Sequence, residues 1–278
     1  MIAATDVRDG IDLHLHTLAS DGRWTPAGLV ARAVRAGIGT IAVTDHDTVA
    51  SVAEVATSTR ASGITAIAGV EVTVHWRGVP LHLLAYGDAV TGPEVGAILA
   101  RGRDAIDAWV RDRVTRLPDG LARHALASSG TPLTITALVR AARASALGTD
   151  MRDALRMVGT LLPGSPPGLD LADVARALGA AGAITILAHP MREGSLTRAL
   201  DLQALGSLLD EVPEIEGIEV AHPGHPLAVR STLAALATRR AMLVTAGSDS
   251  HGPARGRLPF AWPADLARAF LDRCRATN

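Results

Sequence analysis

The chain alternates between two hydrophobic periods, one typical of strands and one typical of helices. Apolar and polar side chains alternate from Ile11 to Leu15, which predicts a strand. A helical stripe follows from Thr25-Pro26 and ends at Gly37, with Thr25 as the expected N-cap. A second helix is expected over 49–61. The further expected strands lie at 41–43, 64–74, 79–87, 183–188, 217–221 and 241–247.

These seven strands, separated mostly by helical patterns, predict parallel βα units, and hence an α/β barrel with polar residues at its strand ends. Residues 88–168 interrupt the pattern, because they contain no convincing strand and read as helices at 95–117 and 135–147. We therefore expect a barrel formed by residues 1–87 and 169–278 and a helical insertion, or cap subdomain, over 88–168. The insertion is either a lid or a packed subdomain.

Composition narrows the class of protein. The 278 residues include 27 basic and 28 acidic side chains, for a net charge of −1, which argues against a large nucleic-acid footprint. The single cysteine, Cys274, excludes an intrachain disulfide. The sequence MIAATDVRDG has charges where a signal peptide needs an apolar core, and no long apolar run is present. We expect a cytoplasmic protein that does not associate with membranes.

Histidines and carboxylates recur at the expected strand ends. On the first strand Asp12, His14 and His16 share one face, which places two imidazoles side by side. The candidate ligands are His14, His16, Asp21, His46, Glu71, His82, His189, Asp249 and His251. Nine groups are too many for one ion, so two or three metals fit better, and imidazoles with a carboxylate suit Mn, Fe or Zn. Asp12 and Asp45 are expected to orient histidine ligands.

Six segments of the sequence resemble the motifs of one known family. These are DLHLHTLASDG, AVTDHDT, GVEV, HLLAYG, LAHP and GSDSHG, which are similar in order and type to the metal-binding motifs of the PHP (polymerase and histidinol phosphatase) superfamily. The resemblance covers nearly the whole chain outside the insertion. It implies a distorted (β/α)7 barrel with a trinuclear metal centre.

The resemblance also implies how the ligands divide among three divalent ions. His14, His16, Glu71 and Asp249 would bind one ion. Glu71, His82 and His189 would bind a second, with Glu71 as the bridge. Asp21, His46 and His251 would bind the third. The residue pattern alone does not assign ligands to individual ions.

The expected reaction is hydrolysis of a phosphomonoester, with Glu71, Asp249 and His225 as catalytic residues. Several cations suit this chemistry because they generate hydroxide at neutral pH and offset phosphoryl charge. The length and position of the insertion resemble the branch of nucleoside bisphosphate phosphatases and short-oligonucleotide exonucleases. That likeness places His225 near the substrate phosphate, and His222 and Arg192 are further candidates for substrate binding.

The chain departs from that branch in two places, which bear on the substrate. The insertion lacks the branch's G-R-x-H element, and Ala221-His222 replaces the usual aromatic-Asn pair after GIEV. We expect a phosphatase redirected to another nucleotide-like or specialised-metabolite monophosphate.

Other functions stay open at this point. The alternatives are a 5'-3' exonuclease on short oligonucleotides, a histidinol-phosphate phosphatase, a non-catalytic accessory domain and a C–N hydrolase. The last usually needs a lysine bridge or a different ligand spacing, and the chain contains no lysine. The oligomeric state and the metal used in the cell do not follow from the sequence.

Overall fold

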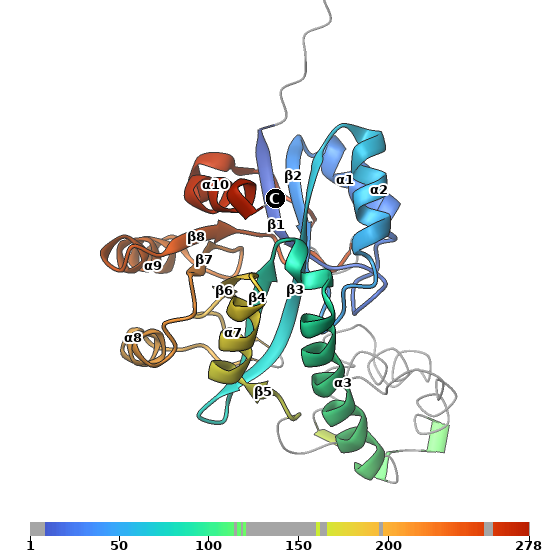
Figure 1. Cartoon of the computed structure of the whole chain (residues 1–278), viewed down its shortest axis with the longest axis vertical. Helices are drawn as coiled ribbons and strands as arrows, with labels where there is room; N and C mark the ends of the chain where they lie inside the picture. Colours follow the sequence, from blue (N-terminus) through green and yellow to red (C-terminus); the bar gives the residue numbers. More distant parts are fainter. Residues whose placement is uncertain are drawn as a thin grey trace, which may run out of the picture.

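The structure is a computed structural model, shown in Figure 1, in which a curved sheet is surrounded by helices. It describes residues 9–113, 116–117, 119–120, 160–161, 166–194, 197–252 and 258–277. The N-terminal elements are β1 (Gly10–Leu15), α1 (Pro26–Arg35), β2 (Ile38–Val43), α2 (Val52–Ser62), β3 (Thr65–Trp76), β4 (Val79–Tyr86), η1 (Asp88–Thr91) and α3 (Pro93–Arg113). After the insertion come β5 (Leu169–Asp170), α7 (Leu171–Ala180), β6 (Ile184–Leu187), α8 (Leu202–Glu211), β7 (Gly217–Ala221), α9 (Leu227–Arg239), β8 (Leu243–Ala246), β9 (Trp262–Pro263), η4 (Ala264–Ala267) and α10 (Arg268–Thr277).

The first helices begin and end close to where the sequence predicts. The Thr25 side chain accepts a hydrogen bond from the Gly28 N–H at 3.1 Å, and Pro26 is the first helical residue of α1. Helix α2 begins at Val52, three residues later than expected, and the Ser51 hydroxyl donates to the Asp45 carboxylate instead of capping the helix. The seven predicted strands are present, and β5 and β9 add two short ones.

Strand β4 runs antiparallel to its neighbours β3 and β6, whereas the sequence pattern indicated parallel βα units. The reason is the two-residue connection from β3, in which Arg77 has φ 50° and Gly78 has φ 78°. Two successive positive φ values make the tight turn that joins antiparallel strands. His82 therefore lies near the beginning of its strand, opposite Thr73 on β3, and still faces the same side of the sheet as Glu71.

The sheet is nearly closed into a barrel. Its strand order is β8-β7-β6-β4-β3-β2-β1-β9, with β5 paired to β3. The two ends meet just beyond β1 and β8, where the His16 N–H donates to the Ser250 carbonyl at 3.1 Å and the Asp249 N–H donates to the His14 carbonyl at 2.9 Å. The seam of the barrel is thus built by the segments that carry the predicted ligands.

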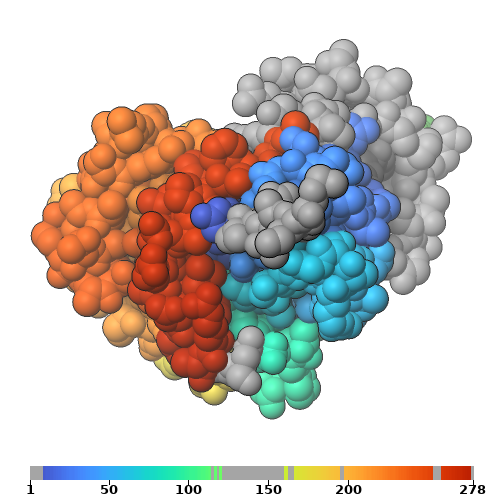
Figure 2. Space-filling view, turned by 90° about the horizontal axis from the view of Figure 1, so that it is seen from above, coloured from blue at the N-terminus to red at the C-terminus, as the bar shows by residue number. Residues whose placement is uncertain are grey.

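One end of the barrel is filled by an apolar cluster. Tyr86 is fully buried there, its hydroxyl donates to the Leu13 carbonyl at 2.7 Å, and its ring meets Phe270 of α10 edge to face at 4.9 Å. Figure 2 shows the C-terminal segment, in red, lying between the orange segment that includes α9 and the blue N-terminal segment. Burial of this cluster anchors the strands whose other ends carry the polar site.

Helix α3 follows η1 in the expected insertion and packs on the barrel through buried residues, among them Val95, Ile98 and Leu99. It ends at Arg113 rather than at residue 117. The helix expected at 135–147 lies outside the described residues, so the division into barrel and lid stays a prediction. Among the residues that the structure describes, no helix has the length and apolarity needed to cross a membrane.

Candidate metal centre

Strand β1 and the residue that follows it carry the first two predicted ligands, His14 and His16, which are both fully buried. All six residues of β1 are buried, because the strand is covered on both faces. His14 lies between two carboxylates, with Nε2 3.0 Å from Glu71 Oε2 and Nδ1 3.0 Å from Glu219 Oε1. His16 follows directly after the strand, and its ring stacks on that of His251 with the centroids 4.0 Å apart.

Glu71 of β3 is the centre of the site, since five imidazole rings surround its fully buried carboxylate. The ring nitrogens divide between the two oxygens. Oε1 lies 2.8 Å from Nδ1 of His82 and 3.2 Å from Nε2 of His189, while Oε2 lies 3.0 Å from Nε2 of His14, 3.2 Å from Nε2 of His16 and 3.3 Å from Nδ1 of His46. A carboxylate whose two oxygens face different sets of imidazoles has the geometry expected of a bridging ligand.

The imidazoles keep Glu71 ionised. Burial alone would raise the pKa of this carboxyl, but the neighbouring rings of His14, His82 and His46 hold the pKa well below its usual range. Glu71 therefore carries a negative charge throughout the neutral pH range and is ready to bind a cation.

Two further carboxylates complete the site from the segments after β1 and β8. Asp249 Oδ1 lies 3.3 Å from His16 Nε2 and 3.3 Å from His251 Nδ1, and Asp21 Oδ1 lies 3.0 Å from His251 Nε2. Asp249 has φ 52° and His189 has φ 27°, which are left-handed values that non-glycine residues rarely adopt. Backbone strain of this kind is common where a chain must aim a functional side chain.

The structure brings all nine predicted ligands together. Among the residues that the structure describes, four groups have ligand atoms within 4.8 Å of one another: His16, Asp21, His46 and His251; His14, His16 and Asp249; His46, Glu71 and His82; and His14, His189 and Glu219. The donors fit divalent cations, because they combine imidazole and carboxylate without a thiolate. His16 supports this fit, since its ring is fully buried but neither ring nitrogen has a hydrogen-bond partner of good geometry within the described residues.

Glu219 of β7 belongs to the site but was not predicted from the sequence. It is fully buried, accepts a hydrogen bond from the His189 N–H at 2.9 Å and contacts His14 through Oε1. The imidazole of His14 contributes to holding the pKa of Glu219 at about 2, against the effect of burial. The sequence did contain an indication of this role, because Glu219 is the single charged residue of the otherwise apolar strand GIEVA. An unpaired charge buried in such a strand would be costly, so a partner for Glu219 could have been expected.

We expect Glu219→Gln to weaken manganese binding by about tenfold to a hundredfold, because the carboxylate orients His14 from behind. Isothermal titration of the metal-free protein with manganese measures the change. Glu216→Gln is the matched control, since Glu216 lies just before β7 and pairs with Arg273 outside the site. Equal affinities for the two variants would show that Glu219 does not orient His14.

Metal binding is expected to release protons. Burial lowers the pKa of both His14 and His16, but nearby carboxylates outweigh it, raising the pKa of His14 well above its usual value and that of His16 to about 10. Both rings are therefore protonated at neutral pH before metal binds, and a ligand imidazole must be neutral. Manganese affinity should rise with pH up to the pKa of His16, and pH-stat titration should record proton release. Affinity that is independent of pH would contradict this.

Two of the three predicted substrate residues, Arg192 and His222, contact Asp249, and the ring of His225 lies next to that of His222 with the centroids 5.5 Å apart. Arg192 donates through Nη1 to Asp249 Oδ2 at 3.2 Å and is 22% exposed at its side chain. His222 Nδ1 accepts from the Gly224 N–H at 2.8 Å, so its proton lies on Nε2, which is 3.4 Å from Asp249 Oδ2. His225 is fully buried, and its Nδ1 donates to the Val220 carbonyl at 3.0 Å.

Asp12 and Asp45 support the site through the backbone and hydroxyl groups rather than through histidine rings. Asp12 accepts backbone N–H groups of Ser248 and Phe260 at 2.8 and 3.1 Å. Asp45 accepts the Thr17 N–H and side-chain hydroxyls at 2.5 to 2.7 Å. Both carboxylates hold the segments that carry the ligands.

A buried set of imidazoles and carboxylates at one end of a barrel has the chemistry of a metal-dependent hydrolase. Comparisons with known proteins narrow this class. Residues 12–108 match the family described as the PHP domain. The chain is 30% identical over 276 residues to a 3',5'-nucleoside bisphosphate phosphatase of Chromobacterium violaceum, with 92% of each protein covered. The chain belongs to the PHP family.

Two other proteins show the range of this likeness. A 5'-3' exoribonuclease of Haemophilus influenzae is 30% identical over 255 residues, covering 87% of this chain and 90% of that protein. Among solved structures, the chain superposes with a TM-score of 0.80 on a protein of Bifidobacterium adolescentis that is described as a metal-dependent phosphoesterase on the basis of prediction. The two sequences are 26% identical, and the superposition covers 95% of this chain and 96% of that protein. The barrel expected from the sequence is confirmed, and the family is one of metal-dependent phosphoesterases.

Proposed function

We propose that the protein hydrolyses a phosphomonoester of a nucleotide or nucleotide-like small molecule with three divalent ions, which are Mn, Fe or Zn. The observation that carries the proposal is the arrangement around Glu71, whose two oxygens face separate sets of imidazoles. Asp21 and His251 add a third set next to it. In this proposal His14, His16, Glu71 and Asp249 bind one ion, Glu71, His82 and His189 the second, and Asp21, His46 and His251 the third.

Divalent ions in such a site supply hydroxide at neutral pH and neutralise charge on a phosphoryl group. The protein's own residues then set the geometry. The buried walls of β1 and β3 fix the ligand side chains before substrate arrives, so that little reorganisation is needed during the reaction. Arg192 combines a contact to Asp249 with partial exposure, which suits a guanidinium that also binds a phosphate oxygen.

His222 and His225 take different roles in this proposal. His222 donates from Nε2 toward Asp249 Oδ2 and so holds that carboxylate in place. His225 is buried and its Nδ1 donates to the Val220 carbonyl, which fixes the ring, while its Nε2 has no hydrogen-bond partner of good geometry among the described residues and is left for the role near the substrate that the sequence suggested. The Gly224 N–H, which donates to the His222 ring, lies between the two histidines in the chain.

Hydrolysis of short oligonucleotides is the second candidate function. The similarity to an exoribonuclease over most of both chains favours it, because the same donor set serves either phosphate ester. The two reactions differ in product, since a phosphatase releases inorganic phosphate and an exonuclease releases nucleotides.

The test compares products from the manganese-loaded protein supplied with 3',5'-bisphosphates, 5'-monophosphates, histidinol phosphate and short RNA. Inorganic phosphate released preferentially from one monophosphate supports the proposal. Nucleotides released from RNA, with no phosphate from small molecules, would establish the exonuclease. A strong preference for a 3',5'-bisphosphate would keep the phosphatase but remove the redirected specificity that Ala221-His222 suggests.

A further inference from the structure

His46 differs from the other histidine ligands in how its backbone is held. It lies beyond the end of β2 in a turn and is joined to β3 only by an isolated bridge with Glu71. Its side chain is also the most exposed of the ligand histidines, at 21%. The position of its ring therefore depends on what holds the turn formed by residues 45–47.

Asp47 fixes this turn against β3. Its N–H donates to the Glu71 carbonyl at 2.9 Å, and its carboxylate accepts the N–H and hydroxyl of Thr73 at 2.8 and 2.7 Å. These bonds hold Asp47 at φ 53°, a left-handed conformation that the surrounding contacts must stabilise.

The Asp47 carbonyl of the same turn is held by the insertion. Arg103 of α3 donates to it through Nη1 at 2.6 Å. No carboxylate is found within ion-pair distance of Arg103 in the part of the chain that the structure describes, and its side chain is half-buried. A charge-assisted donor is thus directed at a single backbone carbonyl next to a ligand.

Helix α3 is a firm support for this contact. Ile98 and Leu99 are buried in the same apolar cluster as residues of β3 and β4, and a Cβ atom added at Gly102 would lie 3.6 Å from the side chain of Leu169 of β5. These contacts place the backbone of α3 relative to the barrel up to the residue before Arg103. A shift of the helix would therefore move the Asp47 carbonyl and, with it, His46.

We infer that Arg103 is a positioning residue that couples the insertion to the metal centre by holding the turn that carries His46. The inference rests on the proposed metal centre. It gives α3 a role in the site even though none of its residues is among the predicted ligands. The contact reaches the ion that Asp21, His46 and His251 are proposed to bind.

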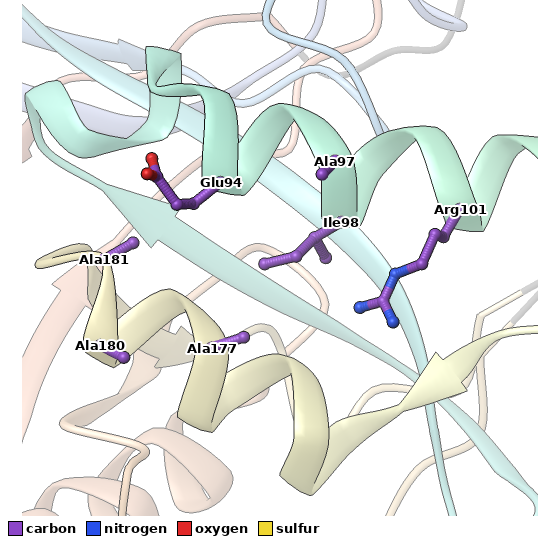
Figure 3. Close-up of a pocket in the computed structure, with 7 residues that line it drawn as sticks. All are labelled: Glu94, Ala97, Ile98, Arg101, Ala177, Ala180 and Ala181. Atoms are coloured by element: carbon purple, nitrogen blue, oxygen red, sulfur yellow. The ribbon is translucent and has the colours of Figure 1, made fainter.

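The matched control is Arg101 on the same helix. It lies about 200° around the helix from Arg103. Figure 3 shows it beside Ala177 of α7, where α3 and α7 form a groove with a volume of about 610 Å³. Arg101→Met removes the same charge from α3 without touching the turn.

The main experiment measures manganese binding by the full-length Arg103→Met protein. Methionine keeps most of the apolar stem and removes the donors. We expect one class of manganese site to weaken by about tenfold to a hundredfold, with backbone amides 44–48 of the metal-free protein exchanging faster with deuterium. Arg103→Lys, which keeps a donor, should restore part of the affinity. Unchanged binding and exchange in Arg103→Met would overturn the inference.

A double-mutant cycle separates this role from a general loss of stability. If Arg103 acts through His46, Arg103→Met should weaken manganese binding no further in a His46→Ala background. Additive losses would overturn the inference even if Arg103→Met lowers the melting temperature. Failure of the proposed function would look different. A protein that binds manganese but hydrolyses no phosphomonoester would still allow manganese affinity to be compared in the Arg103→Met protein and in the double-mutant cycle. If the unaltered protein binds no metal, amide exchange at 44–48 still tests the contact.

Discussion

Glu71→Ala is expected to lower phosphate release by at least ~10³-fold while the protein stays folded. The physical reason is that this carboxylate faces two sets of imidazoles at once, with Oε1 2.8 Å from His82 Nδ1 and Oε2 3.0 Å from His14 Nε2. Removing it separates the two sets and leaves the buried histidines without their central counter-charge. Phosphate release, manganese content and circular dichroism of the variant measure the three consequences.

Two variants sharpen this prediction. Glu71→Gln keeps the shape of the side chain but removes the charge, so it should lose manganese while the barrel remains intact. Glu54→Ala on the exposed face of α2 removes a carboxylate outside the site and should leave phosphate release unchanged. Glu71→Ala protein that is fully loaded with manganese and as active as the unaltered protein would refute the bridging role.

Gly247→Ala is expected to have the second-largest effect. A Cβ atom at this position would lie 2.2 Å from the Cβ of His14 and 2.8 Å from Glu219 Oε1, so one of these groups must move. Crowding of a packed interior costs roughly 1–3 kcal/mol of unfolding free energy. Displacement of His14 by about 1 Å should reduce phosphate release by about 10²-fold. Denaturant unfolding and the phosphate assay measure the two effects.

The control for Gly247→Ala is the same substitution where space is open. Gly179 of α7 has no heavy atom within 4 Å of the position that a Cβ would take. Gly179→Ala should stabilise the helix by about 0.5–1 kcal/mol without affecting activity. If the two alanine variants have the same unfolding free energy and the same rate of phosphate release, the close approach of Gly247 to His14 does not determine the position of His14.

Much of the fold could be predicted because backbone geometry imposes simple periods. The alternation from Ile11 to Leu15 placed His14 and His16 on one face, and Thr25-Pro26 marked the start of α1. The direction of β4 was missed, because the polar residues suggested another parallel strand end while the short Arg77-Gly78 turn determines the pairing. In that case the local turn outweighs the regular alternation of strand and helix.

The candidate ligands could be selected one by one from the sequence, but the arrangement of these side chains around Glu71 required coordinates. Residue type and position made Glu71 a candidate, yet the division of its oxygens between His82 and His46 depends on how β4 and the turn after β2 lie on either side of β3. Glu219 was missed because it lies in an otherwise apolar strand, where its partner His14 is 205 residues away in the sequence. Hydrophobic periodicity depends on residues that are close in the sequence, so it does not predict a contact between two residues that are this far apart.

The seam between β1 and β8 makes the metal centre a part of the barrel wall. His14 and Asp249 contribute both a side chain to the site and a backbone hydrogen bond to the closure of the sheet. A cation that draws these two side chains together therefore also acts as a clasp on the sheet, in the way that a structural ion would. The backbone hydrogen bonds of the seam do not depend on the ion, so a descendant of this chain that lost its ligands would keep a closed barrel and lose only this added reinforcement.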